Sequence, residues 1–413
     1  LAPGMDDIVI HPDGVRKLLR NIKPNKASGP DGIQARFLKE TADQLAPGLA
    51  LLYQASLQQG HIPDDWRQAF IAPVFKKGDR SLASNYRPVS LTSICCKVLE
   101  HIIHSNVLKH LDHHGLLTDF QHGFRKGRSC ESQLLLTIND LAKGLNEGQQ
   151  LDAILLDFSK AFDKVSHKKL IAKLRHYGIQ GDILTWIQDF LFHRTQTVVL
   201  NGKSSEEAPV TSGVPQGTVL GPLLFLVYVN DLPDGLSATP RLFADDCLLY
   251  RTFSSDEDGR SLQSDLDILQ QWETDWSMEF NPDKCEVLRL TNKKSSISTS
   301  YFIHGHPLKV VDSAKYLGVT LQAKLSWNQH IDKICKKANS TRAFLQRNLH
   351  ACPPPVRARC FATFVIPTLV YASCVWDPHT RRNVDKLEMV QRKGARFVTG
   401  DWRRSSSVNE MLA

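Results

Sequence analysis

The stretch RLFADDCLLY, residues 241–250, places two adjacent carboxylates, Asp245 and Asp246, between two apolar runs. Its composition is typical of a β-hairpin whose tip carries the two aspartates. One interpretation is structural, because Asp is favoured in turns, where its side chain accepts hydrogen bonds from nearby backbone N–H groups. The other is chemical, because like charges at close range raise each other's pKa unless a cation lies between them.

A metal ion would resolve this conflict, since neither chain neighbour of the pair, Ala244 or Cys247, is basic. Carboxylate oxygens suit Mg²⁺ or Mn²⁺. A further carboxylate at the end of a neighbouring strand would complete such a site. Asp157 directly follows AILL (153–156), a short apolar run that predicts a buried strand, and it is therefore the available third ligand.

Strand patterns occupy the middle of the chain, and helical patterns occupy its two ends. The spacing of apolar residues predicts helices in residues 1–60, in 94–111 and beyond Trp327. Short runs rich in β-branched and aromatic residues predict further strands at Trp66–Val74 and at 197–200, the latter followed by the turn-forming pair Asn201-Gly202.

Positive charge gathers in the C-terminal quarter of the chain. Residues 324–413 contain 16 Lys and Arg against six Asp and Glu, whereas the whole 413-residue chain has a net charge of +8. A basic helical segment suits a polyanion such as nucleic acid, although a solvated helix face can have the same composition.

Several classes of protein are disfavoured. No charged leader precedes an apolar run, and no apolar run approaches the roughly 18 residues that a membrane helix needs. The nine cysteines include the adjacent pair Cys95-Cys96 and no C-x-x-C spacing, which is typical of reduced thiols in an intracellular protein rather than of disulfides or zinc. Because the chain begins at Leu1 and stops just after a helical pattern has started, we expect it to be a segment of a longer protein.

Three segments resemble, in order, the core motifs of reverse transcriptases: LDFSKAFDKV (156–165), SGVPQGTVLGP (212–222) and FADD (243–246). AFD in the first, PQG in the second and FADD in the third are similar to the non-LTR retrotransposon, or LINE-type, branch. The flanking segments agree with this branch, namely KASGPDGI (26–33), FKKGDRSLASNYRPVSL (75–91), QHGFRKGRS (121–129), NPDKCEVL (281–288), KYLGV (315–319) and VYASCVWDPHTRR (370–382). One short motif is weak evidence, but the ordered series is strong.

The resemblance implies an α+β fold of the right-hand polymerase type, with fingers, a palm built on an antiparallel sheet flanked by helices, and a helical thumb. On that pattern, residues 1–150 form an N-terminal extension and the fingers, 151–322 the palm, and 323–413 a basic thumb that we expect to be truncated. The implied activity is that of an RNA-directed DNA polymerase, which extends a primer 3′-hydroxyl with dNTPs on an RNA template by two-metal-ion catalysis.

Catalytic and metal-binding roles follow from the matching motif positions. Asp157 and Asp245 match metal ligands, Asp246 matches a further catalytic position, and the carbonyl of Phe158 would add an oxygen ligand. Mg²⁺ is the implied cofactor, with Mn²⁺ also possible. Lys284 matches the lysine that gives a proton to the leaving pyrophosphate, although a plain surface lysine fits the sequence equally well. The family often has Thr after that lysine, where this chain has Cys.

The implied nucleotide-binding residues are Lys76, Arg87, Phe162, Gln216 and Gly217. Lys76 and Arg87 would hold the triphosphate, with the adjacent Lys77 as an alternative to Lys76. Phe162 would lie beneath the incoming sugar, where its ring would clash with a 2′-hydroxyl. A simple core role for Phe162 and a turn-forming role for Gly217 are the competing interpretations.

Contacts with the template and primer are also implied. Leu317 and Gly318, in KYLGV, match the primer grip, although an ordinary strand would have the same local sequence. Salt-dependent phosphate contacts are implied for a set of basic residues, namely Arg125, Arg128, Lys333, Lys336, Lys337, Arg381, Arg382, Arg392 and Lys393. Any single member of this set can equally be a solvated charge.

The expected partners are an RNA template, a DNA primer and dNTPs, without a membrane. In the family the primer is usually nicked chromosomal DNA, which implies a nuclear site of action. This sequence shows no nicking nuclease, and such a domain would lie upstream of Leu1. Two alternatives remain open. One is an inactive element remnant that binds nucleic acid without catalysis, and the other is a group II intron or telomerase-like reverse transcriptase.

Overall fold

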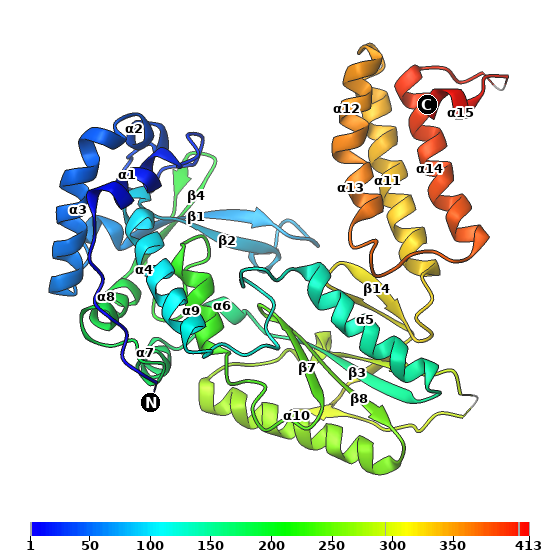
Figure 1. Ribbon diagram of the computed structural model, residues 1–413, viewed down its shortest axis with the longest axis horizontal. Coiled ribbons are helices and arrows are strands. Elements are labelled where there is room, and N and C mark those ends of the chain that lie inside the picture. Colours follow the sequence, from blue (N-terminus) through cyan, green and yellow to red (C-terminus); the bar gives the residue numbers. More distant parts are fainter. Residues whose placement is uncertain (1, 294, 404, 413) are drawn as a thin grey trace. The chain divides into compact units, whose positions relative to one another are not determined.

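The computed structural model describes residues 2–293, 295–403 and 405–412. The chain divides into two compact units, each built from three segments of sequence. Unit 1 comprises Leu1–Phe124, Phe158–Gly235 and Asp267–Phe280, and unit 2 comprises Arg125–Asp157, Leu236–Leu266 and Asn281–Ala413. Both units mix helices with sheets (Figure 1), which agrees with the expected α+β class.

A five-stranded sheet forms the centre of unit 2, in the order β12-β9-β3-β8-β7. The strands are β3 (Gln150–Asp157), β7 (Thr239–Phe243), β8 (Asp246–Phe253), β9 (Glu286–Leu290) and β12 (Lys309–Val311). Neighbours are antiparallel except for β12 and β9, which run parallel. Helix α5 (Cys130–Asn146) packs on this sheet (Figure 1), and helix α10 (Asp256–Trp276) begins in unit 2 and ends in unit 1.

The central position of β3 explains its sequence. β8 pairs with it along its whole length and β9 with Leu151–Leu155, so both edges are hydrogen-bonded. Six of its eight residues are buried, which suits its largely apolar sequence. The one charged side chain inside it, Asp152, is fully buried but accepts hydrogen bonds from Arg289 and from the Tyr301 hydroxyl. The strand predicted from AILL and the hairpin predicted from RLFADDCLLY are both confirmed.

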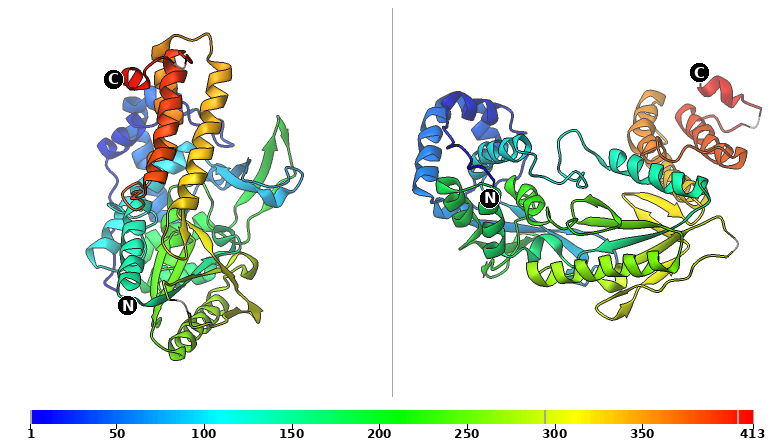
Figure 2. Two further views of the ribbon diagram at one scale, coloured as in Figure 1. Left: turned by 90° about the vertical axis from the view of Figure 1, so that its right-hand side faces the viewer. Right: turned by 60° about the horizontal axis from the view of Figure 1, so that its bottom comes forward.

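Two short hairpins and a helical bundle complete unit 2. The hairpins are β10 (Phe302–Ile303) with β11 (His306–Pro307), and β13 (Ser313–Tyr316) with β14 (Val319–Gln322). The helices are α11 (Asn328–Asn348), α12 (Pro354–Phe364), α13 (Ile366–Val370), α14 (Arg381–Thr399) and α15 (Val408–Leu412). Helices α11, α12 and α14 run side by side (Figure 2), and α11 also packs against β14.

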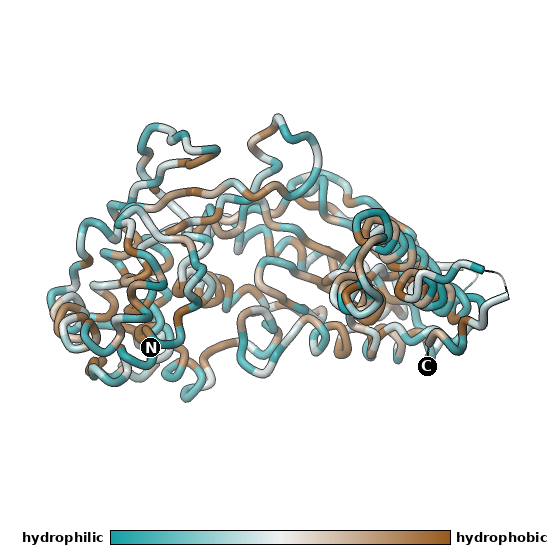
Figure 3. The backbone as a smooth tube through the Cα atoms, turned by 90° about the horizontal axis from the view of Figure 1, so that it is seen from above, coloured by the Kyte–Doolittle hydropathy of each residue, from teal (hydrophilic) through white to brown (hydrophobic). Residues whose placement is uncertain are grey.

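The C-terminal helices are amphipathic rather than uniformly basic. Hydrophobic and hydrophilic residues alternate along the tube near the C-terminus (Figure 3). In α14, Val390 and Phe397 are buried, whereas Arg392 and Lys393 are exposed. Val390 and Phe397 belong to the same hydrophobic core as the central sheet, so the helical pattern predicted beyond Trp327 is confirmed and its basic residues form the outer face.

Unit 1 joins a helical layer to a second sheet. Its helices are α1 (Pro12–Arg20), α2 (Ala35–Glu40), α3 (Ala42–Gln59), α4 (Ile94–His113), α6 (Ala161–Lys164), α7 (His167–His176), α8 (Gly181–Leu191) and α9 (Leu220–Tyr228). Its strands are β1 (Gln68–Phe75), β2 (Tyr86–Leu91), β4 (Thr195–Leu200), β5 (Lys203–Ser204) and β6 (Ala208–Pro209). The path is β2-β1-β4-β5, with β6 also on β4.

The strand predicted from Trp66 begins two residues later, at Gln68. Trp66 ends a short 3₁₀ turn instead, and its ring is buried against that of Tyr53, 6.0 Å away between centroids. Burial of this large ring explains why an aromatic strand-like residue lies outside the strand.

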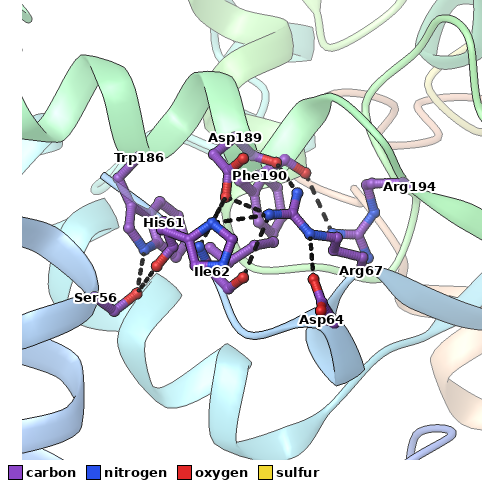
Figure 4. Close-up of polar contacts among 9 residues, drawn as sticks. All are labelled: Ser56, His61, Ile62, Asp64, Arg67, Trp186, Asp189, Phe190 and Arg194. Carbon is purple, nitrogen blue, oxygen red and sulfur yellow. Dashed lines mark hydrogen bonds and ion pairs between the residues drawn. The ribbon is translucent and has the colours of Figure 1, made fainter. Parts of the chain in front are cut away.

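Polar contacts fix the start of β1 (Figure 4). The Arg67 guanidinium donates to Asp189 Oδ2 at 2.7 Å and to the Asp189 carbonyl at 3.2 Å. The backbone N–H of Ile62 donates to the same carboxylate at 2.8 Å. Trp186 donates to Ser56 Oγ at 2.9 Å. Arg67 and Asp189 are largely buried, and charge-assisted hydrogen bonds between such residues are stronger than exposed ones. These contacts hold α3, α8 and the start of β1 together.

All nine cysteines carry free thiols in this structure. In the part of the chain that the structure describes, no helix has both the length and the apolar character to cross a membrane.

Candidate active site

Asp157 and Asp246 lie directly opposite each other at one end of the central sheet of unit 2. Asp157 is the last residue of β3 and Asp246 the first of β8, and the antiparallel register pairs them. A two-residue turn, Ala244-Asp245, joins β7 to β8, with Ala244 at a φ of +55°. A positive φ at this point is what tight hairpins require, so the turn brings two carboxylates to the end of β3.

The like charges affect one another. Burial, followed by the charges of Asp245 and Asp157, raises the pKa of Asp246 to about 6, whereas the charge of Lys315 acts in the opposite direction. Asp246 nevertheless remains exposed to solvent, so neighbouring atoms surround its carboxylate only in part. A carboxylate cluster with this electrostatic strain favours a positively charged ligand.

Lys284 lies beside Asp157. It ends a 3₁₀ turn (Pro282–Lys284) that begins after Asn281, whose side chain accepts from the N–H of Asp283. The backbone N–H of Asn281 donates to the carbonyl of Asp157 at 2.8 Å. The Lys284 ammonium donates to Asp157 Oδ2 at 3.0 Å, and both side chains are about half exposed. These two hydrogen bonds connect the segment NPDKC (281–285) to the end of β3, although the two are far apart in the sequence.

A cavity of about 270 Å³ opens beside these residues, within unit 2. Asp157, Asp246 and Lys284 line it, whereas Asp245 lies outside the lining. The opposite wall is the turn between β13 and β14, where Leu317 and Gly318 have positive φ values of +43° and +89°.

Two further charged residues of this cavity, Glu286 and Lys315, were absent from the sequence-based set. Lys315 is exposed between the buried Ala314 and Tyr316, and this alternation is the sequence signal that could have identified it. It lies two residues before Leu317 and adds a second basic side chain, after Lys284, to the lining of the cavity.

The donor set suits a hard divalent cation, because carboxylate and carbonyl oxygens prefer such ions. Within the described residues, however, no three His, Cys, Asp or Glu side chains are grouped as a metal ion would require. In this arrangement Asp157 is paired with Lys284 instead. The chemistry of the oxygens and the raised pKa of Asp246 fit a cation.

The triphosphate candidates lie on the β1–β2 hairpin of unit 1. Val74 pairs with Arg87, and the N–H of Lys76 donates to the carbonyl of Asn85 at 2.9 Å, so the pairing continues past the end of β1. Because side chains alternate along a paired strand, this pairing puts Lys76 on the same face as Arg87, whereas Lys77 lies in a bend beyond the strand. Lys76 and Arg87 are both exposed.

Phe162 is half-buried in unit 1. Its ring stacks on Phe225, with centroids 4.3 Å apart and an angle of 17° between planes, and meets Phe124 edge-on at 6.4 Å. One face is therefore packed while part of the ring stays accessible. This position is compatible with a role in the core and with a role facing the nucleotide.

Gln216 and Gly217 follow in a loop that contacts β2. Gln216 accepts from the N–H of Ser90 at 2.7 Å through its carbonyl and donates from its side chain to Asp163 at 3.2 Å. Gly217 has a φ of +111°, and a Cβ there would lie 2.6 Å from the Ser90 carbonyl. Glycine is therefore required by close backbone approach. A cavity of about 400 Å³ in unit 1 is lined by Gln216 and Asp163.

The remaining basic candidates are distributed over unit 2, whereas Phe158 belongs to unit 1. Arg125 and Arg128 precede α5 and are half-exposed, whereas the C-terminal candidates are exposed on α11 and α14, namely Lys333, Lys336, Lys337, Arg381, Arg382, Arg392 and Lys393. Phe158 follows Asp157 in the chain, and its buried ring stacks on Phe280 at 4.3 Å.

Comparison with known proteins identifies the relatives of this chain. It is 29% identical over 403 residues to the RNA-directed DNA polymerase from mobile element jockey of Drosophila melanogaster, covering 94% of this chain and 43% of that protein. It is 28% identical to the probable RNA-directed DNA polymerase from transposon BS of the same species, covering 96% and 46%. The probable RNA-directed DNA polymerase from transposon X-element of that species is 27% identical, covering 92% and 43%.

The chain thus spans less than half the length of these relatives. They confirm the resemblance to the non-LTR, LINE-type branch. The family model described as reverse transcriptase (RNA-dependent DNA polymerase) matches residues 74–321. This chain belongs to the reverse transcriptase family.

Proposed function

We propose that this chain is the polymerase segment of a non-LTR retrotransposon protein and extends a primer 3′-hydroxyl with dNTPs on an RNA template. The observation that carries the proposal is the direct pairing of Asp157 with Asp246, beside Lys284, in one cavity. A chromosomal DNA primer, as in the family, would mean that the protein acts in the nucleus.

Mg²⁺, or Mn²⁺ in its place, would be held by Asp157, Asp245, Asp246 and the carbonyl of Phe158. When bound, such ions neutralise the triphosphate and the developing charge on the attacking and leaving oxygens. The high pKa of Asp246 supports this assignment, because a cation relieves the repulsion that favours the protonated form. Lys284, beside Asp157, would give the proton to pyrophosphate.

The nucleotide would be bound by residues of unit 1. Arg87 and Lys76, on one face of the β1–β2 hairpin, offer cationic donors to the triphosphate. Phe162 would exclude the 2′-hydroxyl, and Gln216 with Gly217 would contact the nucleotide and template. The packing of Phe162 on Phe225 supports this role, because the stacking restricts rotation of the Phe162 ring away from the sugar.

The primer end would lie at Leu317 and Gly318, and the phosphates of the hybrid at the exposed basic residues of α11 and α14. These assignments correspond to a right-hand polymerase, with an N-terminal extension and fingers in 1–150, the palm in 151–322 and the thumb in 323–413. The sharing of one hydrophobic core by the helices of 323–413 and the central sheet supports a thumb anchored on the palm.

The test is extension of a DNA primer on an RNA template with dNTPs and Mg²⁺, comparing the wild type with Asp245→Asn. Asp7→Asn, at an exposed aspartate far from the cluster in sequence, is the matched control. We expect extension by the wild type and the control, and none by Asp245→Asn. Equal binding of the hybrid without extension by any variant would instead favour an inactive binding remnant.

A panel of templates separates the remaining alternative. A LINE-type enzyme should accept a DNA primer paired to RNA templates of unrelated sequence. Strict dependence on one structured intron-like or telomere-template RNA would favour a group II intron or telomerase-like enzyme instead.

A further inference from the structure

Tyr371 contacts the turn that forms one wall of the candidate active-site cavity. Its hydroxyl donates to the carbonyl of Leu317 at 2.9 Å. Leu317 is a non-glycine residue at a φ of +43°, a sparsely populated backbone region, so its conformation depends on support from its surroundings. Tyr371 supplies such support from 54 residues further along the chain.

The tyrosine ring also lies close to Gly318. A Cβ at this glycine would be 2.9 Å from Tyr371 Cε1, and Gly318 has a φ of +89°. The ring and the hydroxyl therefore engage two successive residues of the same turn. Both of these residues line the cavity that contains Asp157 and Asp246.

Tyr371 is itself held in place from two sides. Trp376, which is buried, donates from its indole N–H to the Tyr371 carbonyl at 2.8 Å and meets the His330 ring at 5.0 Å. The N–H of Ala372 donates to the Glu131 carboxylate, near the start of α5, at 3.3 Å. The segment thus connects the start of α5 and helix α11 to the turn.

Core packing alone does not account for this tyrosine. Its side chain remains 40% exposed, so the burial of apolar surface is incomplete. Burial, together with Cys130 and Glu131, raises the pKa of Tyr371 to about 12, so the hydroxyl stays protonated and can donate at any physiological pH. The hydrogen bond from the hydroxyl to the Leu317 carbonyl adds a directional contact to this partial burial.

We propose that Tyr371 is a positioning residue that fixes the Leu317–Gly318 turn and thereby holds the primer terminus in the candidate active site. This proposal rests on the proposed polymerase function. The hydroxyl acts through the Leu317 carbonyl and touches no reacting atom.

The test compares Tyr371→Phe, which keeps the ring, with Tyr371→Ala, which removes it. Val370→Ala, at the neighbouring and 52% exposed position, is the matched control. We expect Tyr371→Phe to weaken binding of a primer–template hybrid by about three- to tenfold, as loss of one hydrogen bond implies. It should shorten the products made per binding event, whereas KM for dNTP stays unchanged.

Hydrogen exchange gives a readout that does not require catalysis. The amides of Gly318 and Val319 should exchange faster in Tyr371→Phe than in the wild type. Wild-type behaviour of Tyr371→Phe, with defects only in Tyr371→Ala, would assign the ring to packing and overturn the proposal. A Tyr371→Phe defect explained by a lower melting temperature would also overturn it. If the wild type binds the hybrid but does not extend it, the polymerase proposal fails while the binding and exchange measurements still test Tyr371.

Discussion

Asp157 and Asp246 face each other across neighbouring strands, and Asp245 precedes Asp246 in the hairpin turn. Like charges placed directly opposite each other destabilise a sheet. The chain has this arrangement at the end of β3, in which six of eight residues are buried and where neutral residues would be more stable. Such a cost is expected where a site binds cations, as we propose for this cluster.

The first prediction concerns the stability of the metal-free protein. The pKa of Asp246 rises from 3.8 to about 6 on folding, so the folded state binds an extra proton between these values. The stabilisation this provides is present below pH 4 and is lost as the pH rises through 6. Asp246→Asn cannot titrate and should therefore become more stable than the wild type, by about 1 kcal/mol at pH 7.5, since Asp246 stays partly solvated.

Urea unfolding in EDTA at pH 4.5 and 7.5 measures this difference. We expect the gap between Asp246→Asn and the wild type to be small at pH 4.5 and to open at pH 7.5, whereas Asp7→Asn should follow the wild type at both values. Added Mg²⁺ should stabilise the wild type and not the variant. A gap that is the same at both pH values would show that repulsion at Asp246 is not its cause.

The second prediction separates the two interpretations of Lys284. If Lys284 is a proton donor, Lys284→Met should lower kcat about a hundredfold. If it is a solvated surface lysine, the same change should leave kcat nearly unaltered. Its ion pair with Asp157 is about half exposed, so unfolding free energy should change by less than about 1 kcal/mol in either case.

The measurement is kcat for single-nucleotide addition, with Lys309→Met at an exposed strand position as the control. The Mg²⁺ concentration needed for half-maximal rate should not increase in Lys284→Met, because removal of the ammonium frees Asp157. An unchanged kcat would assign Lys284 to the surface.

Local patterns in the sequence determined much of the fold. The hairpin around Asp245 was predictable because its apolar flanks alternate with a polar tip, and the helix that begins at Ile94 was predictable from its apolar spacing. The strand predicted from Trp66 starts at Gln68 instead, because aromatic residues favour strands but can equally be buried in a 3₁₀ turn, as Trp66 is.

Long-range relationships were not predictable in the same way. The parallel pairing of β1 with β4 joins segments more than 100 residues apart, and no local pattern encodes it. Lys315 was missed because the alternation around it predicts only that the lysine is exposed, and not that a cavity lies beside it. The contact of Tyr371 with Leu317 depends on the docking of the C-terminal helices, which only the folded chain reveals.

The third prediction concerns sugar selection. Phe162→Val should admit ribonucleotides, lowering the ratio of kcat/KM for dNTP over rNTP by at least about tenfold, because the smaller side chain would no longer clash with a 2′-hydroxyl. The stability cost should be about 1 kcal/mol, since the ring is half-buried on Phe225. Phe162→Tyr keeps the ring and should keep the discrimination. Equal ratios in the Val variant and the wild type would assign Phe162 to the core alone.

The fourth prediction uses the register of the β1–β2 hairpin. The pairing puts Lys76 and Arg87 on one face, whereas Lys77 lies in a bend beyond the strand, so we expect the first two to bind the same triphosphate. Arg87→Ala should raise KM for dNTP about tenfold to a hundredfold, the loss expected for charge-assisted hydrogen bonds. Lys76→Ala should have a smaller effect, because a lysine binds phosphate as a point charge without a bidentate fork.

Lys77→Ala is the matched control for this fourth prediction, since it removes an equal charge one residue away, in the bend that follows the paired residues. Steady-state KM for dNTP, measured at fixed primer–template and at two salt concentrations, distinguishes a specific contact from a general loss of positive charge. A general effect would raise KM equally in Lys76→Ala and Lys77→Ala and would weaken at high salt. A rise in KM for Lys77→Ala alone would show that the register continues differently beyond Phe75 and that Lys77 is the triphosphate ligand.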